Sequence, residues 1–204
     1  MNFIEFRDHF HPLGCLNVSQ IRMVYPSFQA NNLSRWIEKG YIVRLRKDWY
    51  AFPDCFRDLG FAFYASNRIY RPSYISCHSA LAFYDMIPEA VSDITAVTTL
   101  KTARYENPLG KFAYASVKEA IFFGYEAKEF DGRTVLMATA EKALLDLLYL
   151  FPILRTEQDF AELRLDEDFM STEFDGKRFR EYAQKAGSKS LIDRAEHLLK
   201  TYVI

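Results

Sequence analysis

The sequence has few glycines and prolines, which form flexible linkers, and few cysteines, which form covalent crosslinks. Its 204 residues include 8 glycines, 7 prolines and 3 cysteines. So few glycines and prolines argue against long flexible linkers. The cysteines, Cys15, Cys55 and Cys77, are odd in number and widely spaced, so we expect no disulfide framework. A reducing, cytoplasmic location suits this cysteine usage.

Long apolar runs are also missing. No stretch approaches the ~20 consecutive apolar residues that span a bilayer. The opening residues, MNFIEFRDHFHPLG, are charged and interrupted, which is unlike a secretory signal. We therefore expect no membrane association.

Patterns typical of metal and cofactor sites are absent as well. The four histidines are His9, His11, His78 and His197, and the chain has no Cys-x-x-Cys pair, helical histidine pair or glycine-rich phosphate loop. Cys77 and His78 are adjacent, and neighbours on a helix do not face each other. We expect no metal, no cofactor and no cysteine nucleophile.

Acidic residues gather near one expected hairpin, and they leave an enzymatic alternative open. Glu126, Glu129 and Asp131 precede the pair Glu141 and Lys142. A metal-dependent nuclease uses two carboxylates and a lysine of this kind. The spacing matches no tight pattern, so we expect solvated side chains, no catalytic residue and no enzyme. A nucleic-acid-processing enzyme is kept as the alternative.

The residues that are abundant predict a packed α+β protein. Half of the chain is hydrophobic and 26% is charged, with 18 Phe and 13 Tyr. The charge is uneven, since residues 1–53 hold seven basic and four acidic side chains while the whole chain carries −1. This asymmetry indicates a basic module joined to a neutral or acidic one. We place the boundary between residues 53 and 60.

Residues 1–55 have the pattern of a winged helix-turn-helix. Three short helices are expected, within residues 2–10, 17–25 and 27–39, with a glycine stop at Gly40. Strands are expected at 41–45 and 49–52, around a turn of sequence RKD. In this layout the third helix enters the DNA major groove and the hairpin lies along the phosphates.

The third helix and the hairpin supply the candidate DNA contacts. If Leu33, Trp36 and Ile37 face the core, Asn31 and Arg35 face away from it. Asn and Arg side chains can form bidentate hydrogen bonds with base edges, and basic residues of the hairpin would neutralise phosphates. The expected DNA-binding residues are Arg22, Gln29, Asn31, Asn32, Arg35, Lys39, Arg44, Arg46 and Lys47. A solvated polar face, or a winged helix that binds only protein, is the alternative.

Residues 56–204 predict a mixed sheet-and-helix domain with C-terminal helices. A helix of about ten residues is expected from Ser76, and strands at 93–100, 110–117, 120–130 and 133–138. Asp131 and Gly132 predict a tight hairpin turn. The strongest helix spans 139–151, with an apolar stripe that includes Leu144 and Phe151. Two more helices are expected at 177–187 and 188–202.

Four segments together resemble the AbiEi family. They are WIEKGYIVRLRKDWYAF, YISCHSALAFYDMIPE, ITAVTT and MATAEKALLDLLY, in this order, within residues 14–150. The most specific are Ala138–Tyr149 and SALAFYDMIP. The chain departs from the family pattern in two places. Many members have a glycine in the hairpin turn before the final tyrosine, where this chain has Asp48 and Trp49. Many members also have a proline at the position of Ala140.

The resemblance implies a regulator and antitoxin of a type IV toxin–antitoxin (abortive infection) system. Residues 1–55 would bind double-stranded DNA at the protein's own promoter. Residues 56–204 would form the antitoxin domain, which opposes a nucleotidyltransferase-like toxin without forming a stable complex. A stand-alone, ligand-responsive repressor remains a further alternative.

Overall fold

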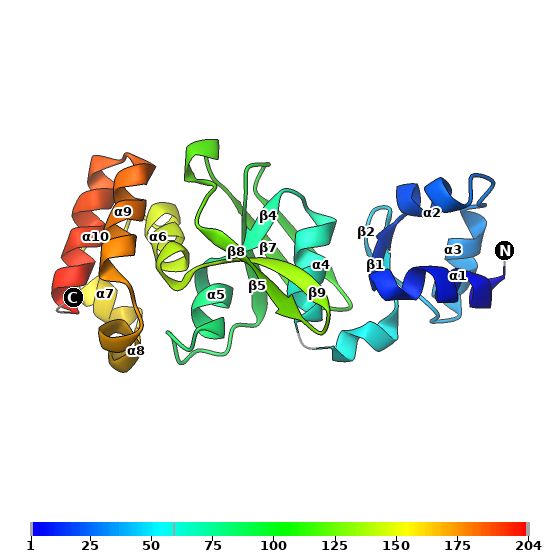
Figure 1. The fold of residues 1–204 in the computed structure, drawn as a ribbon, viewed down its shortest axis with the longest axis horizontal. Helices are drawn as coiled ribbons and strands as arrows, with labels where there is room; N and C mark the ends of the chain where they lie inside the picture. The colour runs from blue at the N-terminus through cyan, green and yellow to red at the C-terminus, as the bar shows by residue number, and fades with distance from the viewer. Residues whose placement is uncertain (1, 59, 203–204) are drawn as a thin grey trace.

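The computed structural model describes residues 2–58 and 60–202 and confirms the α+β class. The chain is arranged along one axis (Figure 1). The N-terminal helices and a small sheet lie at one end, a larger sheet lies in the middle, and four helices lie at the other end. Within the described residues, no helix has the length and apolar character needed to cross a membrane.

The three expected N-terminal helices are present. They are α1 (Phe3–Phe10), α2 (Val18–Val24) and α3 (Asn31–Glu38), and a short 3-10 turn, η1 (His11–Leu13), follows α1. Asn2 and Asn17 begin α1 and α2 with reciprocal capping hydrogen bonds to Glu5 and Gln20. Gly40, with φ +69°, follows α3 in the left-handed conformation expected after a helix.

The N-terminal sheet has three antiparallel strands, in the order β1-β3-β2. The hairpin of β2 (Val43–Arg46) and β3 (Trp49–Ala51) follows the expectation, whereas β1 (Cys15–Asn17) is only three residues long and was not expected. Asp48 has φ +64°, so it supplies the left-handed turn conformation without a glycine. The pairing of β2 with β3 slips by one residue between Arg44 and Arg46.

An aromatic cluster forms the core of this region. The ring of Phe6 contacts the rings of Phe10, Trp36 and Phe52, at centroid distances between 4.5 and 5.9 Å. Leu33 and Trp36 of α3 are buried as expected. Ile37 was expected in the same core but is 37% exposed. The helix therefore buries a narrower stripe than its sequence predicted.

The central sheet has six strands, in the order β6-β7-β5-β4-β9-β8. Its strands are β4 (Ser73–Ile75), β5 (Asp93–Thr98), β6 (Ala103–Asn107), β7 (Gly110–Ser116), β8 (Tyr125–Phe130) and β9 (Arg133–Ala138). The sheet is mixed, because β5 is parallel to β7 and β4 is parallel to β9, while the other pairs are antiparallel.

Most differences from the expected strands lie where the local pattern is weak. Asp131 and Gly132 both have positive φ and close the β8–β9 hairpin as expected. The strand before them starts at Tyr125 rather than near residue 120, because Glu119–Ile121 forms a 3-10 turn. The short strand β4 and the polar strand β6 were not expected. The partners of β4, which are β5 and β9, are distant in sequence, whereas β6 pairs with β7, the next strand along the chain.

Helices cover the sheet and extend the chain beyond it. They are η2 (Pro53–Arg57), α4 (Phe61–Ile69), α5 (Cys77–Phe83), α6 (Ala140–Leu150), α7 (Glu157–Glu162), α8 (Glu167–Thr172), α9 (Gly176–Ala186) and α10 (Lys189–Thr201). The expected helices at Ser76, 139–151, 177–187 and 188–202 are present. The helices α4, α7 and α8 were not expected.

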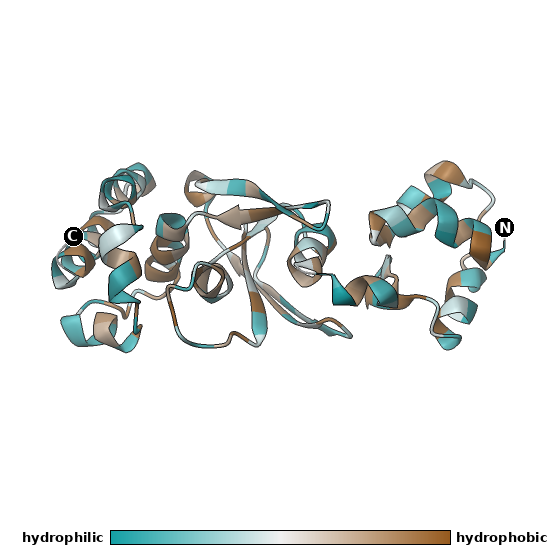
Figure 2. Ribbon diagram, turned by 60° about the horizontal axis from the view of Figure 1, so that its bottom comes forward, coloured by the Kyte–Doolittle hydropathy of each residue, from teal (hydrophilic) through white to brown (hydrophobic). Residues whose placement is uncertain are grey.

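The helix α6 is the centre of the C-terminal half. Figure 2 shows it, brown along much of its length, between the sheet and the terminal helices. Leu144 is fully buried, as its apolar stripe predicted. The polar side chains of Glu141, Lys142 and Asp146 are buried too. Phe151, expected on the stripe, is 47% exposed just after the helix ends.

Candidate nucleic-acid interface

The helix α3 presents a polar face away from its buried side. Asn31, Arg35 and Lys39 are exposed, opposite buried Leu33 and Trp36. The sequence predicted Asn31, Arg35 and Glu38 on that face, with Asn32 and Lys39 beside it. The first three and Lys39 are exposed, so the face also carries one acidic side chain. The side chains of Asn31, Arg35 and Lys39 offer amide, guanidinium and ammonium groups, which are the groups that bond base edges and phosphates.

Two further candidates border this face. Asn32 is half-buried, and its Oδ1 accepts a hydrogen bond from Nη2 of Arg35. This bond orients the guanidinium along the helix surface. Gln29 is exposed just before α3, and its carbonyl accepts from the amide of Asn32 at 3.0 Å. Arg22 is exposed on α2, the helix before.

The hairpin carries two exposed basic side chains. Arg44 lies on β2, and its Nε donates to the carbonyl of Arg46 at 3.4 Å. Lys47 is exposed in the turn. The turn itself is held by the amide of Val18, which donates to the carbonyl of Asp48 at 3.0 Å. Both basic groups are therefore available to a ligand on the surface.

Arg46 differs from the expectation. Its Nη1 donates to the carbonyl of Ile69 at 2.5 Å, and its guanidinium carbon lies 4.9 Å from the ring centroid of Tyr70 and 4.7 Å from that of Tyr105. The register of the β2–β3 pairing shifts between Arg44 and Arg46, at the point where the Arg46 side chain turns toward the central region. The guanidinium binds the central region of the protein, so we remove Arg46 from the candidate phosphate contacts.

The edge of β2 also contacts the central region through its backbone. Nδ2 of Asn107, at the end of β6, donates to the carbonyl of Leu45 at 3.1 Å. The hairpin therefore lies between α3 and the central sheet rather than projecting freely. Sequence patterns did not reveal this contact, because Leu45 and Asn107 are 62 positions apart.

Large apolar side chains are also exposed in the N-terminal region. Ile4 is 70% exposed and Met23 is 82% exposed, while Val24 and Tyr41 are each 43% exposed. Single exposed apolar residues are common on soluble proteins. They are also compatible with the alternative in which this region binds protein.

The acidic residues considered for a nuclease are separated by the fold. Oε1 of Glu129 accepts from the hydroxyl of Thr134 at 2.6 Å, and Glu126 lies 3.4 Å from the ammonium of Lys128. Glu141 is buried under α9, where Oε1 accepts from the amide of Asp175 at 3.2 Å. These carboxylates each have a different local partner and do not form one site.

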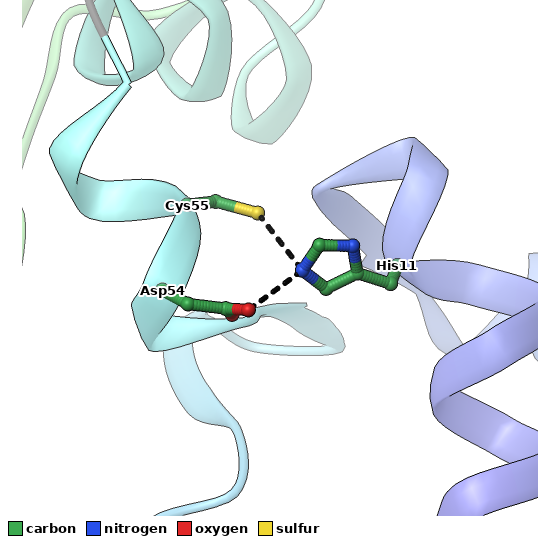
Figure 3. Close-up of side chains that lie close together, drawn as sticks. All are labelled: His11, Asp54 and Cys55. Carbon is green, nitrogen blue, oxygen red and sulfur yellow. Dashed lines mark hydrogen bonds and ion pairs between the residues drawn. The ribbon is translucent and has the colours of Figure 1, made fainter.

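One group of potential metal ligands does come together in the described part of the chain: His11, Asp54 and Cys55 (Figure 3). The imidazole of His11 points from η1 toward η2, with Nε2 at 2.8 Å from Oδ2 of Asp54 and 3.9 Å from Sγ of Cys55. Sequence spacing gave no sign of this group, because 43 positions separate His11 from Asp54.

The surroundings of this group do not suit a cation. Nη2 of Arg7 donates to Asp54 at 2.6 Å, and Nη2 of Arg133 lies 3.7 Å from Sγ of Cys55. Burial raises the pKa of the Cys55 thiol, which favours the form that binds metal poorly. Burial alone would also raise the pKa of Asp54, but the hydrogen bonds from Arg7 and His11 lower it overall. The group therefore joins the N-terminal region to η2 as a hydrogen-bonded cluster.

A second polar cluster is fully buried beside α6. The ammonium of Lys142 pairs with Oδ1 of Asp146 and donates to the hydroxyl of Tyr74 at 2.9 Å. Oδ2 of Asp146 accepts from Tyr74 at 2.9 Å and from Ser76 at 2.7 Å. Burial raises the pKa of Asp146, against the opposing effect of Lys142. With its charges paired and no exposed surface, the cluster acts as structural support.

No protein-family model matches this chain, and no curated protein matches it either.

Proposed function

We propose that this protein is a sequence-specific DNA-binding regulator, with residues 2–52 acting as a winged helix-turn-helix. One observation carries the proposal. The exposed face of α3 holds Asn31, Arg35 and Lys39 opposite the buried Trp36. A helix that follows another short helix and presents such groups suits insertion into a major groove.

The hairpin contributes to the same proposal. Arg44 and Lys47 are exposed and would neutralise phosphates beside the groove. Arg22 and Gln29 border the face from the preceding helix and turn. Arg46 is excluded, because its guanidinium is bound within the protein. The proposed interface is therefore smaller than the sequence alone suggested.

The test compares the two kinds of contact. We would titrate the protein against a duplex from upstream of its own coding sequence and against a scrambled duplex, at several salt concentrations. Arg35→Ala should weaken binding to the upstream duplex by about 1–3 kcal/mol and affect the scrambled duplex less. Lys47→Ala should weaken both alike and lower the salt slope by about 1.

A matched control is Lys177→Ala, which removes one exposed positive charge from α9, at the opposite end of the chain. Its binding should equal that of the unmodified protein. If the folded triple variant of Arg35, Arg44 and Lys47 binds both duplexes with unchanged affinity, the interface is not where we propose it. The exposed apolar side chains would then make a protein partner the better candidate.

We also propose that the protein acts as an antitoxin against a nucleotidyltransferase-like toxin in the cytoplasm. Support comes from the resemblance of Ala138–Tyr149 and its companion segments to the AbiEi family. The residues of this motif form α6 and its N-cap in the interior of the C-terminal half. The motif would then maintain the antitoxin fold rather than contact a partner.

Co-expression with a nucleotidyltransferase-like toxin tests the antitoxin role. From a controlled promoter, the full chain should restore growth. The variant Arg35→Ala/Lys47→Ala should restore it equally well, because it changes only the DNA face. Loss of rescue by that variant at equal protein level would show that antitoxicity requires DNA binding. It would contradict our proposal that the N-terminal region binds DNA while the C-terminal half acts as the antitoxin.

A further inference from the structure

A cavity of about 470 Å³ lies between the N-terminal region and the central sheet. We call it the junction cavity. Pro12 and Leu13 of η1 form one wall, while Tyr64 and Arg68 of α4 and Arg133 of β9 belong to the other side. Its volume falls in the range of small-molecule sites, which often lie between domains.

Three guanidinium groups line the junction cavity: those of Arg68, Arg71 and Arg133. Arg133 is paired, since its Nη1 donates to Oδ2 of Asp58 at 2.7 Å. Among residues 2–58 and 60–202, no carboxylate lies within ion-pair distance of Arg68 or Arg71. Two positive charges at one cavity are thus left without an anion.

The cavity wall also holds buried polar atoms that lack partners. They are Oγ of Ser73, Nε of Arg68 and Nε of Arg133. Ser73 is only 3% exposed, so little solvent reaches its hydroxyl. Buried polar groups almost always have hydrogen-bond partners, and a buried donor or acceptor without a hydrogen bond destabilises the fold. These three atoms are enclosed by the wall itself, so the cationic groups that a ligand can reach are the exposed side chain of Arg71 and the half-buried side chain of Arg68.

Aromatic rings complete the lining. Tyr64, Phe122 and Tyr125 all border the junction cavity. The hydroxyl of Tyr64 donates to the carbonyl of Leu13 at 3.0 Å, which fixes this ring against the N-terminal wall. Aromatic faces beside guanidinium groups suit a ligand with both a planar ring and a phosphate.

We propose that the junction cavity binds a mononucleotide. Its phosphate would be held by Arg68 and Arg71, and its base would lie among Tyr64, Phe122 and Tyr125. The proposal does not depend on DNA binding by α3, because it concerns different residues. An occupant would contact both the N-terminal region and the central sheet.

Calorimetric titration of the full chain tests the proposal. The probes are AMP, GMP, adenosine, guanosine and pyrophosphate. At least one monophosphate should bind, more tightly than its nucleoside and more tightly than pyrophosphate. Arg71→Met should weaken this binding about tenfold or more, since a charge-assisted hydrogen bond is lost. Arg71 is exposed, so the variant should remain folded.

Two further variants make the result decisive. Lys177→Met removes the same charge from distant α9 and should leave nucleotide binding unchanged. Ser73→Ala removes only an enclosed hydroxyl that the ligand does not reach and should also leave nucleotide binding unchanged. The proposal fails if neither monophosphate binds, if Arg71→Met binds with the original affinity, or if pyrophosphate binds as tightly as AMP and GMP. It also fails if Arg71→Met weakens only duplex DNA binding, since the cavity would then be a contact for the DNA backbone.

Discussion

The guanidinium carbon of Arg46 lies 4.7 Å from the ring centroid of Tyr105. This contact joins the N-terminal hairpin to β6, the edge strand of the central sheet. Together with the hydrogen bond from Arg46 to the carbonyl of Ile69, it gives a basic hairpin residue a structural role. Part of the basic character of the hairpin is therefore explained without DNA.

We expect Arg46→Met to lower the free energy of unfolding by about 1–3 kcal/mol, because it removes a cation–π contact and a charged hydrogen bond. Chemical denaturation measures the change. The same variant should keep the salt slope of DNA binding. Lys47→Met, one residue further on, should show the reverse pattern of unchanged stability and a smaller salt slope. A stable Arg46→Met protein with a reduced slope would return Arg46 to the phosphate contacts.

The pairing of Lys142 with Asp146 predicts strongly coupled variants. Lys142→Met should cost about 3–5 kcal/mol, because it leaves the carboxylate of Asp146 buried without its cation. Asp146→Asn alone should also destabilise the protein, by stranding the ammonium. The double variant should lose less than the sum of the two, since Asn can still accept from Tyr74 and Ser76. Additive losses in a denaturation cycle would show that the two groups do not interact.

Leu144 tests whether α6 is the core of the C-terminal half. Leu144→Asp should cost about 4 kcal/mol or more, because it buries an unpaired charge where an apolar side chain was fully enclosed. Circular dichroism during heating measures this loss. Ile153→Asp, at a site that is 77% exposed, is the control and should melt like the unmodified protein. Equal melting of both variants would contradict the buried position of Leu144.

The cluster around Asp54 predicts an acid-sensitive contribution to stability. The hydrogen bonds from Arg7 and His11 lower the pKa of Asp54 in the folded protein, so the unfolded chain takes up a proton first as the pH falls. The stabilisation is complete above the unfolded pKa of about 3.9 and is lost as the pH falls through the lower folded value. Between about pH 5 and pH 2, the gap in stability between the unmodified protein and Asp54→Asn should shrink. A gap that widens over this range would reverse the assigned sign.

The sequence by itself determined the elements with strong local signals. The stripe of α6, the stop at Gly40 and the turn at Asp131 and Gly132 all follow from periodicity or backbone preference, and all are present. The exposed polar face of α3 followed in the same way, because a helix with Leu33 and Trp36 inside must turn Asn31 and Arg35 outward. Such features depend on residues within a few positions of one another.

Only the tertiary structure decided how the two regions meet. The partners of Arg46, the joining of His11 to Asp54 and the walls of the junction cavity come from residues 23 to more than 100 positions apart. The short strands β1 and β4 and the helix α4 exist through pairing and packing with distant segments. The segment RIYRP, which contains Arg68 and Arg71, carries two arginines beside a tyrosine and was the available signal for the cavity. The two arginines could be assigned to a cavity only from the fold, which places them near η1 and β9. The burial and the partners of a side chain depend on the whole chain.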